Sequence, residues 1–177
     1  MADNIKNIFL TGAPSSGKTT VIRKIVDKLA HPAQGFHTEE ERINGSRVGF
    51  MMKTLDGKSA YLAHQDIKSQ FHVRRYGVSI SNIENISAQS ISPDNAHTII
   101  ILDEIGKMEC FSDVFRKAVM GALDAPNIVI GTIALGGDNF ITTIKNRKDI
   151  EIIEVTSENR NDLPDSILKR ISQLICN

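Results

Sequence analysis

The residues best suited to chemistry form a short segment from Gly12 to Thr20. Its spacing, G-x-x-x-x-G-K-T, is typical of a loop that binds phosphates through converging backbone N–H groups. In such a loop Lys18 adds a charge toward the β- and γ-phosphates, and the Thr19 hydroxyl is placed to ligate Mg²⁺. The apolar run 8–10 precedes the segment and apolar residues at helical spacing follow it, which is the strand, loop and helix order that the motif requires. The residues that we expect to bind the nucleotide here are Gly12, Ala13, Pro14, Ser15, Ser16, Gly17, Lys18, Thr19 and Thr20.

A second group of candidates, Asp103 and Glu104, follows the apolar run 98–102. That run is rich in β-branched residues and too short for a buried helix, so we predict a buried parallel strand. The carboxyl end of such a strand is where a parallel sheet presents its ligands. We therefore expect Asp103 to hold Mg²⁺, directly or through water, and Glu104 to orient or deprotonate an attacking water. The alternative is that both acids only end a strand and solvate a turn.

The basic residues and histidines carry less specific signals. Arg147 is either an internal arginine finger for the γ-phosphoryl group or part of a surface basic turn. Lys107 either reaches a phosphate or is a solvated turn residue. Arg160 follows the last expected strand, and we predict that it contacts the base or the ribose of a bound nucleotide. The histidines lack metal-ligand spacing, and we expect His37 to be an ordinary surface residue.

The elements that must position these residues alternate along the chain. After the first strand and helix, extended segments at 47–52 and 58–62 are bounded by the turn signals Asn44-Gly45 and Asp56-Gly57. We therefore predict an antiparallel hairpin inserted between the phosphate-loop helix and the Asp103 strand. Residues 64–97 read as polar and irregular. Beyond Asp103 we predict a helix over 111–122, a strand at 128–130, a short helix capped by Asp138, a strand at 151–155 and a last helix that begins near Pro164.

Composition sets ordinary limits. The chain has 177 residues, 41% of them hydrophobic and 24% charged, which suits one globular domain spanning 1–177. A formal net charge of zero gives no global attraction to nucleic acid or to an anionic membrane. There is no apolar run long enough to cross a bilayer, and the two cysteines lack metal-ligand spacing. We expect a cytoplasmic monomer that binds nucleoside triphosphates but neither nucleic acid nor membrane.

Several further motifs resemble one known family. They are GFHTEEER at 35–42, GF at 49–50, YGV at 76–78, DEIGKME at 103–109 and VTSENR at 155–160 followed by LP at 163–164. Nearly the whole chain resembles the small P-loop nucleoside-triphosphatases of thermophiles, which are related to the cancer-related nucleoside-triphosphatase of animals. The DEIGKME run is far more specific than the phosphate loop alone. Two features depart from the family pattern: Ser15 stands where the family has a second loop glycine, and the segment before the Asp103 strand is short of an expected helix.

The resemblance implies both a fold and an activity. The implied fold is α/β, a P-loop NTPase with a RecA-like, mostly parallel sheet flanked by helices. The implied activity is Mg²⁺-dependent hydrolysis of ATP, GTP and other nucleoside triphosphates with loose base preference and slow turnover. Two alternatives use the same scaffold. One is a nucleotide or small-molecule kinase, in which a hydroxyl replaces water, and the other is a nucleotide-gated switch.

Overall fold

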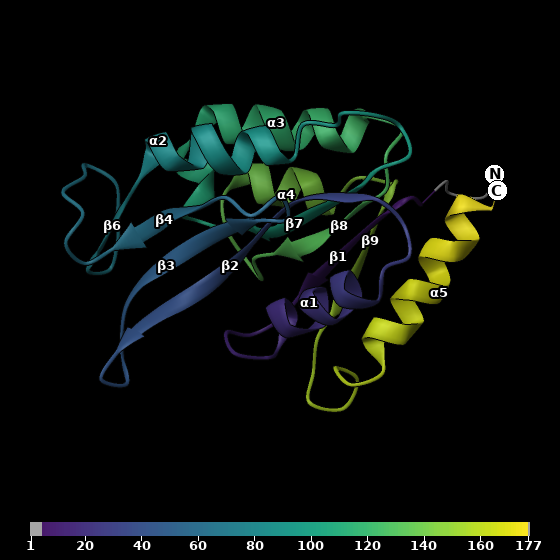
Figure 1. The fold of residues 1–177 in the computed structure, drawn as a ribbon, viewed down its shortest axis with the longest axis horizontal. Coiled ribbons are helices and arrows are strands. Elements are labelled where there is room, and N and C mark those ends of the chain that lie inside the picture. Colours follow the sequence, from purple (N-terminus) through teal and green to yellow (C-terminus); the bar gives the residue numbers. More distant parts are fainter. Residues whose placement is uncertain (1–4, 177) are drawn as a thin grey trace.

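The computed structural model describes residues 5–176, and its strands form one mixed sheet (Figure 1). The strands are β1 (Asn7–Thr11), β2 (Ala33–Ile43), β3 (Ser46–Thr54), β4 (Ser59–His64), β5 (His72–Val73), β6 (Tyr76–Val78), β7 (Ile99–Ile105), β8 (Val129–Ile133) and β9 (Ile150–Glu154). Their order within this sheet is β5-β6-β4-β3-β2-β7-β8-β1-β9. The block β2-β7-β8-β1-β9 is parallel, whereas β3, β4, β6 and β5 extend it with antiparallel pairs. The parallel block therefore gathers its carboxyl ends on one edge of the sheet.

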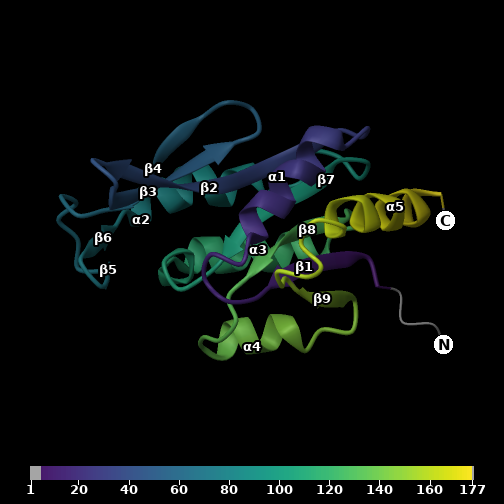
Figure 2. The same ribbon diagram turned by 90° about the horizontal axis from the view of Figure 1, so that it is seen from below.

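Helices cover both faces of this sheet (Figures 1 and 2). The helical elements are α1 (Lys18–Lys28), α2 (Ile80–Asn82), the π-helix η1 (Ile83–Ala88), the 3₁₀ helix η2 (Glu109–Phe111), α3 (Asp113–Asp124), α4 (Asn139–Lys145) and α5 (Leu163–Ile175). One apolar cluster joins α1 and α5 to the sheet, and a second joins α3, α4 and η1 to the opposite face. Alternate side chains of β7 separate accordingly, because Ile99 and Ile101 lie in the first cluster and Ile100 and Leu102 in the second. This strand is thus buried on both faces, as its composition predicts.

The predicted hairpin is confirmed. The turn at Asn44-Gly45 joins β2 to β3, and the turn containing Asp56-Gly57 joins β3 to β4. β2 pairs with β7 over residues 33–36, but its pairing with β3 continues to Ile43. The outer part of the hairpin therefore projects beyond the parallel block, at the left of Figure 1 and on the same side as the loop that precedes α1.

Two predictions about the middle of the chain are wrong. Residues 64–97 are not wholly irregular, because they contain β5, β6 and the continuous helical segment of α2 and η1. Ile83 and Ala88 of that segment are buried in the core. The π-helical turn alters the apolar spacing that identifies an α-helix, and serine, asparagine and glutamine hide it further. In addition, the strand expected at 98–102 continues to Ile105 and so includes both acids.

The predicted helix signals in the last third of the chain are confirmed. The Asp138 side chain accepts hydrogen bonds from the N–H groups of Phe140 and Ile141 at the start of α4. Pro164 lies in the first turn of α5. Among the described residues, none of the helices has the length and apolar character needed to cross a membrane.

Candidate nucleotide site

The loop between β1 and α1 has the backbone conformation that its glycines predict. Gly12 has φ +138°, and a Cβ there would lie 2.9 Å from the carbonyl oxygen of Val155. Gly17, which caps α1, has φ +104°. Ser15 also lies in the left-handed region, at φ 64°. This explains why glycine suits that position in the family pattern, and shows that serine adopts the same conformation here.

Lys18 places its charge at this loop. Its Nζ donates hydrogen bonds to the carbonyl oxygens of Gly12 at 3.0 Å and Ala13 at 3.1 Å. Within residues 5–176 no carboxylate forms an ion pair with Lys18. Together with the N-terminus of α1, the ammonium group makes the loop a positive site suited to phosphate.

Asp103 lies beside the loop and is fully buried. Its Oδ1 accepts a hydrogen bond from the Thr132 hydroxyl of β8 at 2.5 Å. Burial raises the pKa of the Asp103 carboxyl, and the Thr132 and Thr19 hydroxyls act against that shift. The structure therefore brings together the acid and the threonine that we predicted as the metal pair, and it adds Thr132, which no motif in the sequence singles out.

Buried polar atoms without hydrogen-bond partners concentrate near the loop and Asp103. Among the described residues the buried side-chain oxygens that lack a hydrogen bond are Thr11 Oγ1, Ser16 Oγ, Glu41 Oε2 and Asp103 Oδ2. Thr11 ends β1, Ser16 lies in the loop and Asp103 is next to Thr19, so three of these four atoms belong to residues in the loop or beside it. Since buried polar groups are normally satisfied, such a concentration indicates atoms arranged for a polar ligand.

The second predicted acid, Glu104, belongs to a small acidic group. Burial, followed by the charge of Asp103, raises the pKa of Glu104, and the Lys18 ammonium opposes the shift. A Cβ on Gly106 would lie 2.9 Å from a carboxylate oxygen of Glu104 and 2.9 Å from one of Glu109, so both carboxylates converge on this glycine. Burial and the charge of Glu104 raise the pKa of Glu109 to about 8. Glu109 is therefore an acid of the site to which the motif alone assigned no role.

His37 also belongs to the site, and its prediction as an ordinary surface residue is wrong. It follows Phe36, which pairs with Leu102, so His37 lies beside Asp103 across the parallel strands. A protonated ring at this position would lower the pKa of Asp103, and His37 Nε2 lies 3.4 Å from Oε1 of Glu39. The sequence alone does not reveal this pair, because His37 and Asp103 become neighbours only through the register of β2 and β7.

Arg160 lies close to the loop. Its Cδ would be 3.6 Å from a Cβ built on Gly17, the residue that caps α1. The adjoining Val155 donates its N–H to the carbonyl oxygen of Thr11 at 2.8 Å, which joins the end of β9 to the start of the loop. The side chain is exposed. The predicted contact with base or ribose is therefore sterically open to Arg160.

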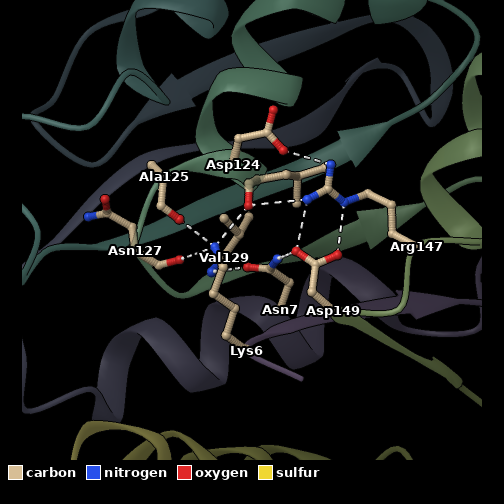
Figure 3. Close-up of polar contacts among 9 residues, drawn as sticks. Lys6, Asn7, Asp124, Ala125, Asn127, Val129, Arg147 and Asp149 are labelled. Carbon is tan, nitrogen blue, oxygen red and sulfur yellow. Dashed lines mark hydrogen bonds and ion pairs between the residues drawn. The ribbon is translucent and has the colours of Figure 1, made fainter. Parts of the chain in front are cut away.

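Arg147, in contrast, is not an arginine finger. Its guanidinium donates to both carboxylate oxygens of Asp149 at 2.9 Å and to Asp124 at 2.8 Å (Figure 3). Asp149 directly precedes β9, so the group lies at the amino end of the parallel strands, opposite the phosphate loop. Lys6 reinforces the same corner by donating to the carbonyl oxygens of Leu123, Ala125 and Asn127. Arg147 joins α3 to β9 and has a structural role.

The oxygen atoms of Asp103 and Thr19 suit a Mg²⁺ ion that is bound partly by substrate and water, and not a metal ion held by protein ligands alone. Within residues 5–176, no three His, Cys, Asp or Glu side chains are grouped to hold a metal ion. Mg²⁺ commonly takes only one or two carboxylates, with substrate phosphates and water completing its shell. The unpartnered Asp103 Oδ2 and the nearby Thr19 hydroxyl match that requirement.

Comparison with known proteins agrees with this geometry. Residues 7–168 match the model of the NTPase family. The chain is 42% identical over 162 residues to nucleoside-triphosphatase THEP1 of Thermotoga maritima, an alignment that covers 91% of this chain and 92% of that protein. It is 36% identical over 180 residues to the human cancer-related nucleoside-triphosphatase, with 92% and 95% covered.

Two solved structures share the fold. The crystal structure of THEP1 from Aquifex aeolicus superposes with a TM-score of 0.85 at 34% identity, and covers 93% of this chain and 98% of that one. The solution structure of a human cancer-related nucleoside triphosphatase gives a TM-score of 0.79 at 33% identity, with 95% and 98% covered. The predicted fold class and the predicted resemblance are both confirmed.

Proposed function

The chain belongs to the NTPase family, and we propose that it hydrolyses nucleoside 5′-triphosphates to the diphosphate and phosphate, with Mg²⁺ and with little preference for the base. The observation that carries this proposal is the meeting of two groups at one edge of the sheet. Lys18 and the α1 N-terminus supply positive charge, and Asp103 supplies a buried carboxylate oxygen without a partner. The names of the relatives, which are nucleoside-triphosphatases, support the same activity.

The phosphates are held mainly by the loop. Backbone N–H groups of residues 12–20 would surround the β-phosphate, and Lys18 would exchange its loop carbonyls for β- and γ-oxygens. Thr19 and Asp103 would hold Mg²⁺, directly or through water. That ion, when bound, neutralises charge that develops on the phosphoryl group.

Glu104 is the residue that we propose for activating water. Its carboxylate is near enough to Lys18 to sense the ammonium charge, and burial makes it a stronger base than an exposed glutamate. Water then attacks the γ-phosphorus, a proton passes to Glu104, and the bond to the β-phosphate oxygen breaks. A kinase would present an acceptor hydroxyl at the same position, and a switch would retain the products until a partner binds.

The loose base preference follows from what the loop contacts. Backbone N–H groups and Lys18 recognise phosphate and not the base. The string 146–149 has the wrong order for a guanine-reading motif, and its Arg147 and Asp149 bind each other at the opposite edge of the sheet. Sharp rejection of a wrong base requires buried polar groups that this base would leave unpaired.

Phosphate release tests the proposal. Wild-type protein with Mg²⁺ and ATP, without any added acceptor, should release inorganic phosphate through many turnovers. Addition of candidate hydroxyl acceptors should leave that rate unchanged. Phosphate release that requires an acceptor would favour a kinase. Release that stops after one turnover, and continues only when a fraction of cell extract is added, would favour a switch.

The Lys18→Ala variant connects this activity to the site. Alanine is a good helix former, so the fold should be retained while the cation that the motif directs at the β- and γ-phosphates is removed. We expect phosphate release to fall by at least about a hundredfold, as for the loss of a strong electrostatic contact in a transition state. Lys24→Ala, an exposed position on the same helix, is the matched control. Activity near that of wild type in folded Lys18→Ala protein would exclude this loop as the site.

A further inference from the structure

Arg160 has an unusual environment for an arginine of this protein. Within residues 5–176, each arginine except Arg74 and Arg160 has a side-chain pairing with a carboxylate, hydroxyl or carbonyl group. Arg160 has no such pairing there, yet it packs against the loop at Gly17. Its guanidinium is thus held beside the nucleotide site and is free to bind a ligand.

The order of the strands indicates which end of the nucleotide Arg160 faces. Asp103 lies on β7 and its partner Thr132 on β8, both on one side of β1. β9, which leads to Arg160, lies on the other side of β1. With Mg²⁺ and the γ-phosphate assigned to Thr19 and Asp103, Arg160 lies on the far side of β1 from them and next to Gly17. We infer that the ribose and the base, and not the γ-phosphate, lie on the side of Arg160.

The turn that presents Arg160 is braced by the residue before it. The Asn159 side chain accepts a hydrogen bond from the Thr156 N–H at 2.9 Å and donates one to the carbonyl oxygen of Glu154 at 2.8 Å. Glu154 is the last residue of β9, so one amide group connects the turn to the end of the strand. The Thr156 hydroxyl adds a contact by accepting from the Asn159 N–H at 3.3 Å.

We propose that Asn159 is a positioning residue that holds Arg160 against the base of the bound nucleotide. This inference rests on the proposed function only in placing a nucleotide at the loop. A guanidinium plane stacks on the π-face that every base presents, so the contact gives affinity without selecting a base. Asn159 acts by limiting the orientations of the turn, which reduces the ordering cost of that contact.

Binding of two probes tests the proposal without depending on hydrolysis. ADP and inorganic pyrophosphate, each with Mg²⁺, share the phosphates that the loop binds, and only ADP carries a base. We expect Asn159→Ala and Arg160→Ala each to weaken ADP binding about five- to tenfold, the scale of one stacking contact. Pyrophosphate binding should change less than about twofold. The binding of CDP should be weakened as much as the binding of ADP.

A double variant separates positioning from a general structural role. If Asn159 acts through Arg160, Asn159→Ala should add less than about twofold to the loss already caused by Arg160→Ala. Asn161→Ala, an exposed asparagine of the same turn, is the matched control and should bind both probes as wild type does. If Asn159→Ala does not fold, Asn159→Asp retains the acceptor for Thr156 and replaces the donor to Glu154 by a charged oxygen, and its pyrophosphate affinity then measures the effect of the added charge.

Three results would overturn the inference. They are unchanged ADP affinity in the Asn159 variants, equal weakening of pyrophosphate, and full addition of the two effects in the double variant. The proposed function fails separately. A wild-type protein that shows the expected binding pattern but releases no phosphate would contradict hydrolysis and leave the role of Asn159 in place.

Discussion

At the scale of single residues, neighbouring acids differ in their surroundings. Asp103 is held by the Thr132 hydroxyl and keeps one buried oxygen without a partner. Burial and the charge of Asp103 raise the pKa of Glu104 while the charge of Lys18 lowers it, and its carboxylate approaches that of Glu109 at Gly106. Adjacent acids in different environments can take different roles, because each environment sets the proton affinity of its own carboxyl group.

Amide substitutions should separate the roles of the first two acids. Asp103→Asn should raise the Mg²⁺ concentration needed for half-maximal phosphate release by roughly tenfold or more, since the oxygen offered to the metal loses its charge. Glu104→Gln should keep Mg²⁺-nucleotide affinity and lower kcat by roughly a hundredfold or more, because an amide does not accept the proton of water. Steady-state kinetics and direct binding measure both effects. An unchanged or higher kcat in Glu104→Gln would remove this residue from the chemistry.

Glu109 gives a prediction about stability and pH. The pKa of Glu109 is about 8 in the folded protein and near 4.5 in an ordinary environment, so the folded state binds more protons between these values. Stability therefore falls as pH rises through this range. Glu109→Gln removes that dependence, and its stability relative to wild type should increase between pH 5 and pH 9 by an amount on the order of a few kcal/mol. Urea unfolding at both pH values measures this difference in the free energy of unfolding, with Glu158→Gln, at an exposed position, as the control. A difference that stays constant with pH would contradict the buried, protonated state of Glu109.

At the scale of elements, the corner formed by Arg147, Asp149 and Asp124 joins α3 to the start of β9 (Figure 3). Arg147 is only partly exposed and its guanidinium binds two acids, so its removal leaves both without the ion pair that they make with it. The pKa of Asp149 is held below its usual value by the Arg147 hydrogen bonds.

Arg147→Ala should therefore weaken the fold and spare the chemistry. We expect a loss of about 1–3 kcal/mol in the free energy of unfolding, from hydrogen bonds to charged groups that are left unmade. The value of kcat/KM should stay within about twofold of wild type at a temperature where both proteins are folded. Denaturant unfolding and phosphate release on the same samples provide the test. A drop of a hundredfold or more in kcat with unchanged stability would restore Arg147 as an arginine finger.

The same elements show what a sequence can and cannot predict. The hairpin turns and the Asp138 cap were predictable because short-range chemistry determines them. The π-helical segment 83–88 was missed because its apolar spacing is not that of an α-helix. His37 and Thr132 were missed as site residues because they reach Asp103 only through strand register and neighbouring strands.

At the scale of the whole molecule, the sheet has two parts with different consequences for the site. The parallel block carries the phosphate loop, Asp103 and the turn that holds Arg160, all at the carboxyl ends of its strands. The antiparallel part extends from β2, which brings His37 beside Asp103. In the function that we propose, these groups bind phosphate, metal and the face of a base, and we therefore expect an enzyme that uses water and does not read the base.

The most direct test is kcat/KM for phosphate release from ATP, GTP, CTP and UTP, with Mg²⁺ and no acceptor. Recognition through phosphate and stacking predicts that all four values lie within roughly tenfold of one another, a spread of about 1.4 kcal/mol in transition-state binding. A preference of about a thousandfold for one base requires about 4 kcal/mol of selective contact, which the loop and Arg160 do not supply. Such a preference, or release that depends on an acceptor, would contradict a base-tolerant nucleoside-triphosphatase.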